Sequence, residues 1–269
     1  MEAGRISRVG ITCALCHSSV DDAVAAGIGH RRDGWANTDL AVGTIVSLAP
    51  GLADELRPVY AAWPPGFFDP RFNVDGISDP VVIPPAYGLG GTGLETYTGE
   101  GPISYWNNYV AVIEMRGHGS FRDPRLGLDI QVAAGEDEVR GKLAELRRYQ
   151  ATLEAPPPPG SFDPAAARAG RRLFEGAAGC SRCHFGPSLG GGGNVHSPAS
   201  TAMDPLYAER GTTGGYRATP LRGLWQRAFF FHDGSASTLG EVVDHYDVAL
   251  GLGMSSAEKA ALVAYLESL

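Results

Sequence analysis

Three shortages in the sequence narrow what the protein can be. It has four cysteines among 269 residues, no apolar run of membrane-spanning length, and fewer basic than acidic residues. With 22 Lys and Arg against 30 Asp and Glu, the formal net charge is −8. Such a charge disfavours a nucleic-acid partner, because proteins that bind nucleic acid present basic surfaces to phosphate. The missing apolar run leaves no candidate transmembrane segment in these residues.

All four cysteines belong to one pattern, Cys-x-x-Cys-His, which occurs twice. The two copies are Cys13, Cys16 and His17, and Cys180, Cys183 and His184. Thiols at this spacing can each add to a vinyl group of haem, and the adjacent imidazole then becomes the fifth ligand of the iron. We therefore predict two covalently bound haem c groups, with His17 and His184 as iron ligands.

Other uses of these cysteines explain the pattern less well. A four-thiolate zinc site would not need a histidine directly after each pair. A thioredoxin-like pair normally lies in a βαβ pattern, which the chain does not show. A disulfide between neighbours three positions apart would close only a tiny loop and would stabilise the fold little.

The spacing of the motifs predicts two domains. The copies lie 167 positions apart (13 to 180), and a Pro-rich stretch at 155–160 separates them. We expect a mainly α fold with two cytochrome c-like domains, each with one covalent haem, and long irregular loops. The boundaries are 1–154 for the N-terminal haem c domain, 155–160 for the linker and 161–269 for the C-terminal cytochrome c domain. The 37 glycines and 19 prolines account for the loops.

Local signals place helices more firmly in the second domain than in the first. Asp163 and Pro164 are suited to the N-cap and first turn of a helix over 165–174. Ser255 and Glu258 form a capping-box pattern before an apolar periodic segment, and a shorter helix is expected over 239–249. In the first domain we expect an irregular wrap over 50–105 and one helix over 136–153, where acidic residues come early and basic ones late.

The predicted cofactor indicates the compartment. Because haem c is attached outside the cytoplasm, we expect a periplasmic or otherwise exported protein. The start of the chain at Met1 then reads as a trimmed terminus from which a leader is missing. The acidic surface permits a basic electron-carrying partner.

Three segments of the second domain resemble one known family. TPLRGL at 219–224, FHDGS at 231–235 and TLGEVV at 238–243 are similar, in order and spacing, to segments of the bacterial dihaem cytochrome c peroxidases and MauG-type enzymes. In the first domain, GIGH at 27–30 resembles the stretch that carries a releasable distal histidine. Glu114 with Met115 resembles the short motif that carries the catalytic glutamate.

The resemblance implies a redox enzyme. Electrons would enter at the C-terminal haem from a small redox protein or another donor, and hydrogen peroxide would be handled at the N-terminal haem. It implies that Glu114 moves the proton needed to cleave peroxide. It also implies that His30 is the distal iron ligand of the N-terminal haem and that Tyr246 is the distal iron ligand of the C-terminal haem. It also implies a tryptophan bridge between the haems, for which Trp106 and Tyr97 are the candidates. A calcium ion between the domains is implied too, but the sequence has no recognisable signature for it.

Several alternatives stay open at this stage. Reasoning from the sequence alone nominates Met254 as the sixth ligand of the C-terminal iron, with His245 as a further candidate, and Met115 and His118 compete with His30. His232 is expected to shape the haem pocket through a hydrogen bond. His196 is expected in a loop, and Met203 lies too close to His184 for a distal ligand. The alternative function is a non-catalytic dihaem electron-transfer cytochrome c with both irons six-coordinate.

Overall fold

The computed structural model describes residues 11–269, which fold into short helices joined by long irregular segments. The α-helices are α1 (Val42–Ser47), α2 (Arg57–Ala61), α3 (Phe72–Asp75), α4 (Ile103–Tyr109), α5 (Leu143–Thr152), α6 (Pro164–Glu175), α7 (Pro198–Thr201), α8 (Leu206–Glu209), α9 (Leu239–Leu250) and α10 (Ser256–Glu267). The predicted mainly α content is confirmed. The expectation of a trimmed terminus concerns residues outside the described part.

The strands are short and pair only with one neighbour each within the described residues. They are β1 (Ser18–Val20) with β2 (Arg31–Asp33), β3 (Phe67–Phe68) with β4 (Val81–Val82), β5 (Phe121–Asp123) with β6 (Leu128–Ile130), and β7 (Val195–His196) with β8 (Tyr216–Arg217), all antiparallel. Single-turn helices include η1 (Cys13–Leu15), η2 (Val110–Glu114, a π-helix), η4 (Arg140–Lys142), η5 (Cys180–Arg182) and η7 (Leu224–Gln226). Among residues 11–269, no helix is both long and apolar enough to cross a membrane.

The helices of the second half form as the local signals predicted. The Asp163 side chain accepts hydrogen bonds from the backbone amides at the start of α6, and Thr238 and Ser255 close capping boxes on α9 and α10. Each such cap stabilises a helix by about 1 kcal/mol. Helices α6 and α10 pack closely where Gly170 leaves room for the backbone of Ala261.

The first half holds together through aromatic side chains rather than long helices. Tyr60, Trp63 and Phe72 are buried against one another in edge-to-face contacts, with ring centroids 4.8–5.7 Å apart. The expected irregular segment 50–105 contains only short elements. The expected helix over 136–153 was wrong in its first turns: α5 begins at Leu143, because the Asp137 carboxylate accepts the amides of Val139 and Arg140 in a local turn.

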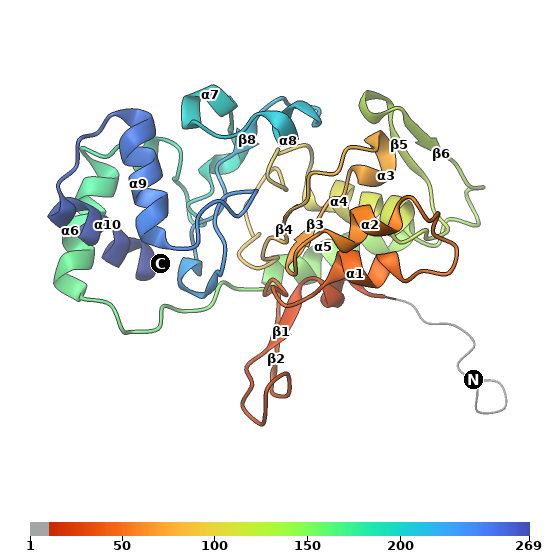
Figure 1. Ribbon diagram of the computed structural model, residues 1–269, viewed down its shortest axis with the longest axis horizontal. Helices are drawn as coiled ribbons and strands as arrows, with labels where there is room; N and C mark the ends of the chain where they lie inside the picture. Colours follow the sequence, from red (N-terminus) through yellow and green to blue (C-terminus); the bar gives the residue numbers. More distant parts are fainter. Residues whose placement is uncertain (1–10) are drawn as a thin grey trace.

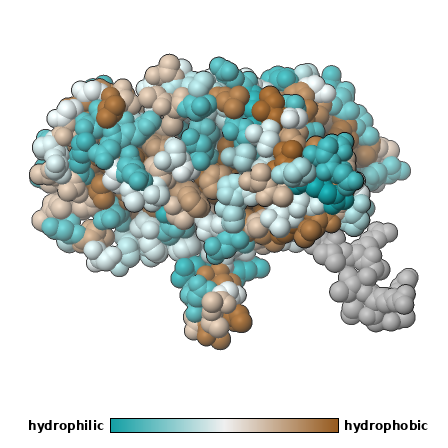
Figure 2. Space-filling model, viewed as in Figure 1, coloured by the Kyte–Doolittle hydropathy of each residue, from teal (hydrophilic) through white to brown (hydrophobic). Residues whose placement is uncertain are grey.

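Figure 1 shows how the two halves meet. Helices α6, α9 and α10 gather at one end, the elements from α1 to α5 gather at the other, and the segment from β7 to β8 lies between them. The Pro-rich residues 156–159 run between the halves without helix or strand. The β1–β2 hairpin projects from the body, and its tip presents the exposed apolar side chains of Val24 and Ile28 (Figure 2).

Candidate haem sites

The two Cys-x-x-Cys-His motifs fold in the same way. Each begins with a single 3-10 turn, η1 or η5, that starts at the first cysteine. The backbone amide of the histidine then bonds to the carbonyl of that cysteine, at 3.1 Å for His17 and 2.9 Å for His184. None of the four cysteines forms a disulfide in the described chain. Both motifs therefore present two thiols and an imidazole on one compact turn.

Both motif histidines are also held by their rings. His17 Nδ1 lies 3.0 Å from the carbonyl oxygen of Pro84, and His184 Nδ1 lies 3.0 Å from that of Leu189. Because a carbonyl can only accept, Nδ1 carries the proton and Nε2 keeps its lone pair. Burial lowers the pKa of both histidines, which favours the neutral imidazole. A neutral ring with a free Nε2 is the form that binds a metal.

Burial disfavours the charged form of two of these thiols. Burial raises the pKa of Cys16 and of Cys180 to about 11, so both sulfurs are protonated near neutral pH. Residues 11–269 contain no cluster of three or more His, Cys, Asp or Glu side chains suited to a metal ion. The structure therefore does not bring the four cysteines together as a zinc site.

A cavity adjoins the second motif. Its volume, counted as the space open to the centre of a water molecule, is about 240 Å³. Cys180, Cys183 and His184 form part of its wall. Most of the remaining wall is aromatic or aliphatic, including Phe174, Phe231, Leu239, Val243 and Leu262. An apolar space beside two thiols and an imidazole fits the body of a haem group.

Two buried polar atoms in the wall of this cavity fit the cofactor's carboxylates. His196 Nε2 and Arg227 Nε are both buried and lack a hydrogen-bond partner among residues 11–269. A buried donor without a partner is costly, so its presence indicates a ligand. Sequence reasoning placed His196 in a loop and overlooked Arg227. In the structure His196 lies on β7, with its Nδ1 3.9 Å from the Cys183 sulfur. No motif or spacing in the sequence indicates this contact.

Three side chains were predicted to compete for the sixth position of the C-terminal iron. Tyr246 and Met254 both line the cavity. Burial, followed by the nearby Cys183 and Cys180 thiols, raises the pKa of Tyr246 to about 12. His245 Nε2 instead lies 2.8 Å from the carbonyl oxygen of Thr201. Which side chain ligates the iron stays a prediction, with Tyr246 and Met254 both in position.

Two other residues singled out from the sequence also line the cavity. His232 is buried, and its Nε2 lies 3.0 Å from the hydroxyl of Tyr216. Its ring stacks on Tyr216, with centroids 4.5 Å apart. Met203 contributes to the same wall. His232 thus lies in the pocket and makes a hydrogen bond there.

The surroundings of the first motif reach toward the second. Leu15 and Cys16 pack against a buried cluster that contains Ile83, and Ala36 packs against the same cluster. Ile83 and Ala36 also line the cavity at His184. Pro84 bonds to the His17 ring, while its neighbour Pro85 lines the same cavity. A single peptide unit therefore touches both sites.

His30 lies on the β1–β2 hairpin, next to the last strand pair of the ladder. Its side chain is 84% exposed, and its Nδ1 is 3.0 Å from Asp21 Oδ2. The hydrogen bonds from His30 and Ala23 lower the pKa of Asp21 to about 2. His17 O accepts the Gly34 amide at the base of this hairpin, so His30 is about 13 Å farther along it, at roughly 3.4 Å per residue. Ligation by His30 stays a prediction.

Glu114 is a half-buried carboxyl at the end of the π-helix η2. Its Oε2 accepts a 2.9 Å hydrogen bond from Asn73 Nδ2, while its Oε1 is buried and has no partner in the described chain. Burial raises its pKa to about 7. Such π-turns are frequent at functional sites, and a carboxyl with this pKa can both hold and release a proton near neutral pH.

The remaining residues singled out from the sequence, the two candidate electron bridges and the two competitors of His30, lie in different surroundings. Tyr97 lines the cavity at His184, whereas Trp106 lies in another buried cluster with Tyr109. Of the two candidate electron bridges, only Tyr97 therefore lines the cavity beside the second Cys-x-x-Cys-His motif. Met115 follows Glu114 directly, and His118 is exposed, with its Nε2 3.8 Å from Glu136.

Sequence relatives cover part of the chain. The cytochrome-c peroxidase IdrP2 of Denitromonas iodatirespirans is 33% identical over 141 residues, which cover 37% of this chain and 38% of the relative. The same-named protein of Pseudomonas sp. (strain SCT) is 30% identical over 144 residues, covering 38% and 39%. The cytochrome c551 peroxidase of Nitrosomonas europaea is 31% identical over 111 residues, covering 37% and 33%. The chain thus matches less than two-fifths of the length of these relatives.

Solved structures with a similar course of the backbone are more distant. A hydrazine synthase structure from Kuenenia stuttgartiensis aligns with a TM-score of 0.49 and 16% identity, covering 71% of this chain and 73% of that one. A MauG-like protein associated with microbial copper homeostasis aligns with a TM-score of 0.47 and 18% identity, covering 70% and 73%. No protein-family model matches the chain.

Proposed function

We propose that this chain, which is similar to bacterial cytochrome c peroxidases over less than two-fifths of their length, is an exported redox enzyme that carries two covalent haem c groups and handles hydrogen peroxide. The observation that carries the cofactor assignment is the shared geometry of the two motifs. In each, a carbonyl fixes the proton on the histidine Nδ1 and leaves Nε2 available. When bound, each haem supplies one-electron redox chemistry and, where its sixth coordination position is open, a place for a small ligand.

The chain offers distinct residues for holding each group. Cys13 and Cys16 would attach the first haem and Cys180 and Cys183 the second, with His17 and His184 as axial ligands. At the second motif, His196 Nε2 and Arg227 Nε make no hydrogen bond within residues 11–269 and suit the propionate carboxylates, since charge-assisted hydrogen bonds to buried carboxylates are strong. The apolar wall excludes water from the macrocycle.

Electron transfer would run from the C-terminal site to the N-terminal site. The peptide unit of Pro84 and Pro85 supports a short route between the two sites, because the Pro84 carbonyl bonds to the His17 ring and Pro85 lines the cavity at His184. Ile83 and Ala36 line the cavity and belong to the cluster against which Leu15 and Cys16 also pack. A small redox protein is the proposed donor.

Glu114 is the proposed proton carrier at the N-terminal site. Cleaving the bond between the peroxide oxygens requires one proton to move from the inner to the outer oxygen. The Glu114 carboxyl has a buried Oε1 that lacks a partner within residues 11–269 and a pKa near 7. Asn73 holds the other oxygen and thereby orients the carboxyl.

A second candidate function is a dihaem cytochrome that only transfers electrons. The observation that favours it is the presence of both Tyr246 and Met254 in the cavity, together with His30, whose Nδ1 bond to Asp21 leaves Nε2 for an iron. These side chains could fill both sixth positions permanently. The protein would then bind no peroxide.

Low-temperature EPR of the purified protein, fully oxidised and half-reduced, separates the two functions. For the enzyme we expect a high-spin ferric signal in one of these states that peroxide consumes. Glu114→Gln should keep the signal but slow its loss by 100-fold or more, on the order expected for general acid–base catalysis. Glu136→Gln, at an exposed position, serves as the control. Two low-spin signals that ignore peroxide would instead establish the electron-transfer protein.

A further inference from the structure

The boundary between the two halves contains a dense group of buried charges. Asp69 and Glu100 come from the first half, and Arg210 comes from the end of α8 in the second half. The side chains of all three are at most 4% exposed. Buried carboxylates need a cation or several hydrogen bonds. The contacts of these carboxylates therefore identify the cation.

Arg210 occupies the centre of one carboxylate group. Its guanidinium lies 2.8 Å from Asp75 Oδ2, 3.0 Å from Asp69 Oδ2 and 3.7 Å from Asp79 Oδ2, and it donates to the carbonyl of Ile77 at 2.7 Å. Four residues of the first half thus converge on one side chain of the second half. This is the coordination pattern of a cation site, with a guanidinium in place of a metal ion.

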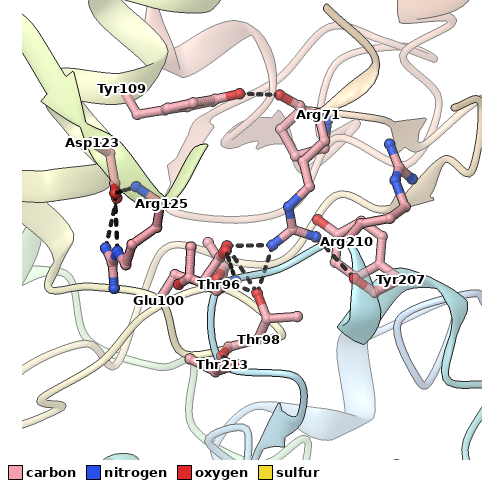
Figure 3. A network of polar contacts seen from close by, with 12 residues as sticks. Arg71, Thr96, Thr98, Glu100, Tyr109, Asp123, Arg125, Tyr207, Arg210 and Thr213 are labelled. Atoms are coloured by element: carbon pink, nitrogen blue, oxygen red, sulfur yellow. Dashed lines mark hydrogen bonds and ion pairs between the residues drawn. The ribbon is translucent and has the colours of Figure 1, made fainter. Parts of the chain in front are cut away.

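Arg71, which belongs to the first half, is the second buried arginine at the boundary. It forms an ion pair with Glu100, and it donates to Thr98 Oγ1 at 2.9 Å and to the carbonyl of Tyr207 at 3.1 Å (Figure 3). Glu100 Oε1 also accepts the backbone amide of Thr212 at 2.8 Å. The carboxylate is therefore bonded from both halves.

Tyr207 joins the two arginines. The guanidinium carbons of Arg71 and Arg210 lie 4.4 Å and 5.8 Å from its ring centroid, within the range of cation–π attraction. Tyr207 is itself 1% exposed. The ring separates two like charges and attracts both.

A calcium ion does not fit this boundary. Calcium takes six to eight oxygen ligands, but the Asp69 oxygens already accept the amides of Arg71, Phe72 and Asp79 as well as Arg210. Two guanidinium groups beside these carboxylates would also repel a divalent cation. We propose that Arg71 and Arg210, in place of the calcium ion implied by the family resemblance, hold the two halves of the chain together.

The test measures metal content and thermal unfolding of the haem-loaded protein. After incubation with calcium chloride and dialysis against chelator-free buffer, elemental analysis should find no calcium bound to the protein, and the melting temperature should be the same in EGTA and in excess calcium chloride. Arg210→Gln should lower the melting temperature by roughly 10 °C, the scale expected when a buried charge group loses one partner. Excess calcium should restore part of that loss, because Asp69, Asp75 and Asp79 would then face one another without a cation.

Arg122→Gln is the matched control, since Arg122 is 65% exposed and its Nε lies 3.5 Å from Asp129. Its melting temperature should stay within about 2 °C of the parent, as for most surface substitutions. If Arg210→Gln does not fold, Arg210→Lys keeps the charge without the fork and should give a smaller drop. One equivalent of calcium in the parent protein, a fall of its melting temperature in EGTA, or an Arg210 variant as stable as the Arg122 control would each overturn the proposal.

Discussion

Asn73 Nδ2 donates a 2.9 Å hydrogen bond to one oxygen of Glu114, and the other oxygen is buried without a partner in the part of the chain that the structure describes. The bond orients the carboxyl, and it also stabilises the charged form. Burial acts in the opposite direction and is the larger effect, so the pKa rises to about 7. The pair therefore keeps a carboxyl both aligned and able to exchange a proton near neutral pH.

The raised pKa of Glu114 predicts a pH dependence of the free energy of unfolding. In the unfolded chain the carboxyl loses its proton near its ordinary pKa of 4.5, but in the folded protein only near 7. Its stabilising contribution is therefore complete below about pH 4.5 and is lost as the pH rises to about 7. The whole loss is about 3.5 kcal/mol, at roughly 1.4 kcal/mol per pKa unit.

Urea unfolding of the parent and of Glu114→Gln at about pH 5 and about pH 8 measures this contribution. The parent should lose about 2.5 kcal/mol more than the variant between these two pH values, because a small part of the loss already lies below about pH 5. Glu136→Gln should follow the parent, because its side chain is 65% exposed. Parallel pH profiles for the parent and Glu114→Gln would show that the carboxyl titrates normally.

Covalent haem attachment should be independent at the two motifs. Each motif has its own turn and its own ring contact, to Pro84 or to Leu189. The double substitution Cys180→Ala with Cys183→Ala should therefore halve the haem content per chain, and the same change at Cys13 and Cys16 should halve it too. Pyridine haemochrome absorbance and intact mass give the count. Loss of all covalent haem from either variant would contradict two separate sites.

Local sequence signals were sufficient for the turns and helices whose contacts are local. Asp163 and Ser255 cap α6 and α10 through bonds that span two or three residues, so the sequence contains the whole interaction. The first turns of the helix expected over 136–153 did not form, for a related reason. Asp137 caps a turn rather than a helix, and single-residue preferences do not distinguish the two.

Contacts between distant segments were outside the reach of the sequence. Arg210 meets Asp69 across 141 positions, and Arg227 reaches the cavity from the end of η7. No periodicity or spacing rule connects such residues, because only the folded backbone brings them together. The Cys-x-x-Cys-His motif predicted the role of the cysteines and of His17 and His184. The residues that line the cavity were identified only in the structure.

Substitutions at Tyr246 and Met254 should identify the sixth ligand of the C-terminal iron. A tyrosinate oxygen favours the ferric state and lowers the potential relative to a methionine sulfur. If Tyr246 is the ligand, Tyr246→Phe should raise the reduction potential by on the order of 100 mV, within the roughly 0.8 V that axial ligands span.

Met254→Leu keeps a similar volume and is the matched variant. It should leave the potential and the visible spectrum unchanged under the tyrosine assignment. A spectroelectrochemical titration of each variant decides between them. A large change in Met254→Leu together with an unchanged Tyr246→Phe would assign the sulfur as the ligand.

Two glycines in helices should respond to alanine with opposite signs. At Gly170 an added Cβ would lie 1.9 Å from the Ala261 carbonyl oxygen and 2.8 Å from Tyr265 Cβ, so α6 and α10 would have to separate. Overpacking of this kind costs about 1–3 kcal/mol, which outweighs the gain of roughly 1 kcal/mol in helix propensity. At Gly240 the nearest atom would be Thr238 Oγ1 at 3.7 Å, an ordinary contact. Urea unfolding should therefore show Gly170→Ala less stable than the parent and Gly240→Ala slightly more stable. A stabilised Gly170→Ala would mean that α6 and α10 pack less closely than their backbones indicate.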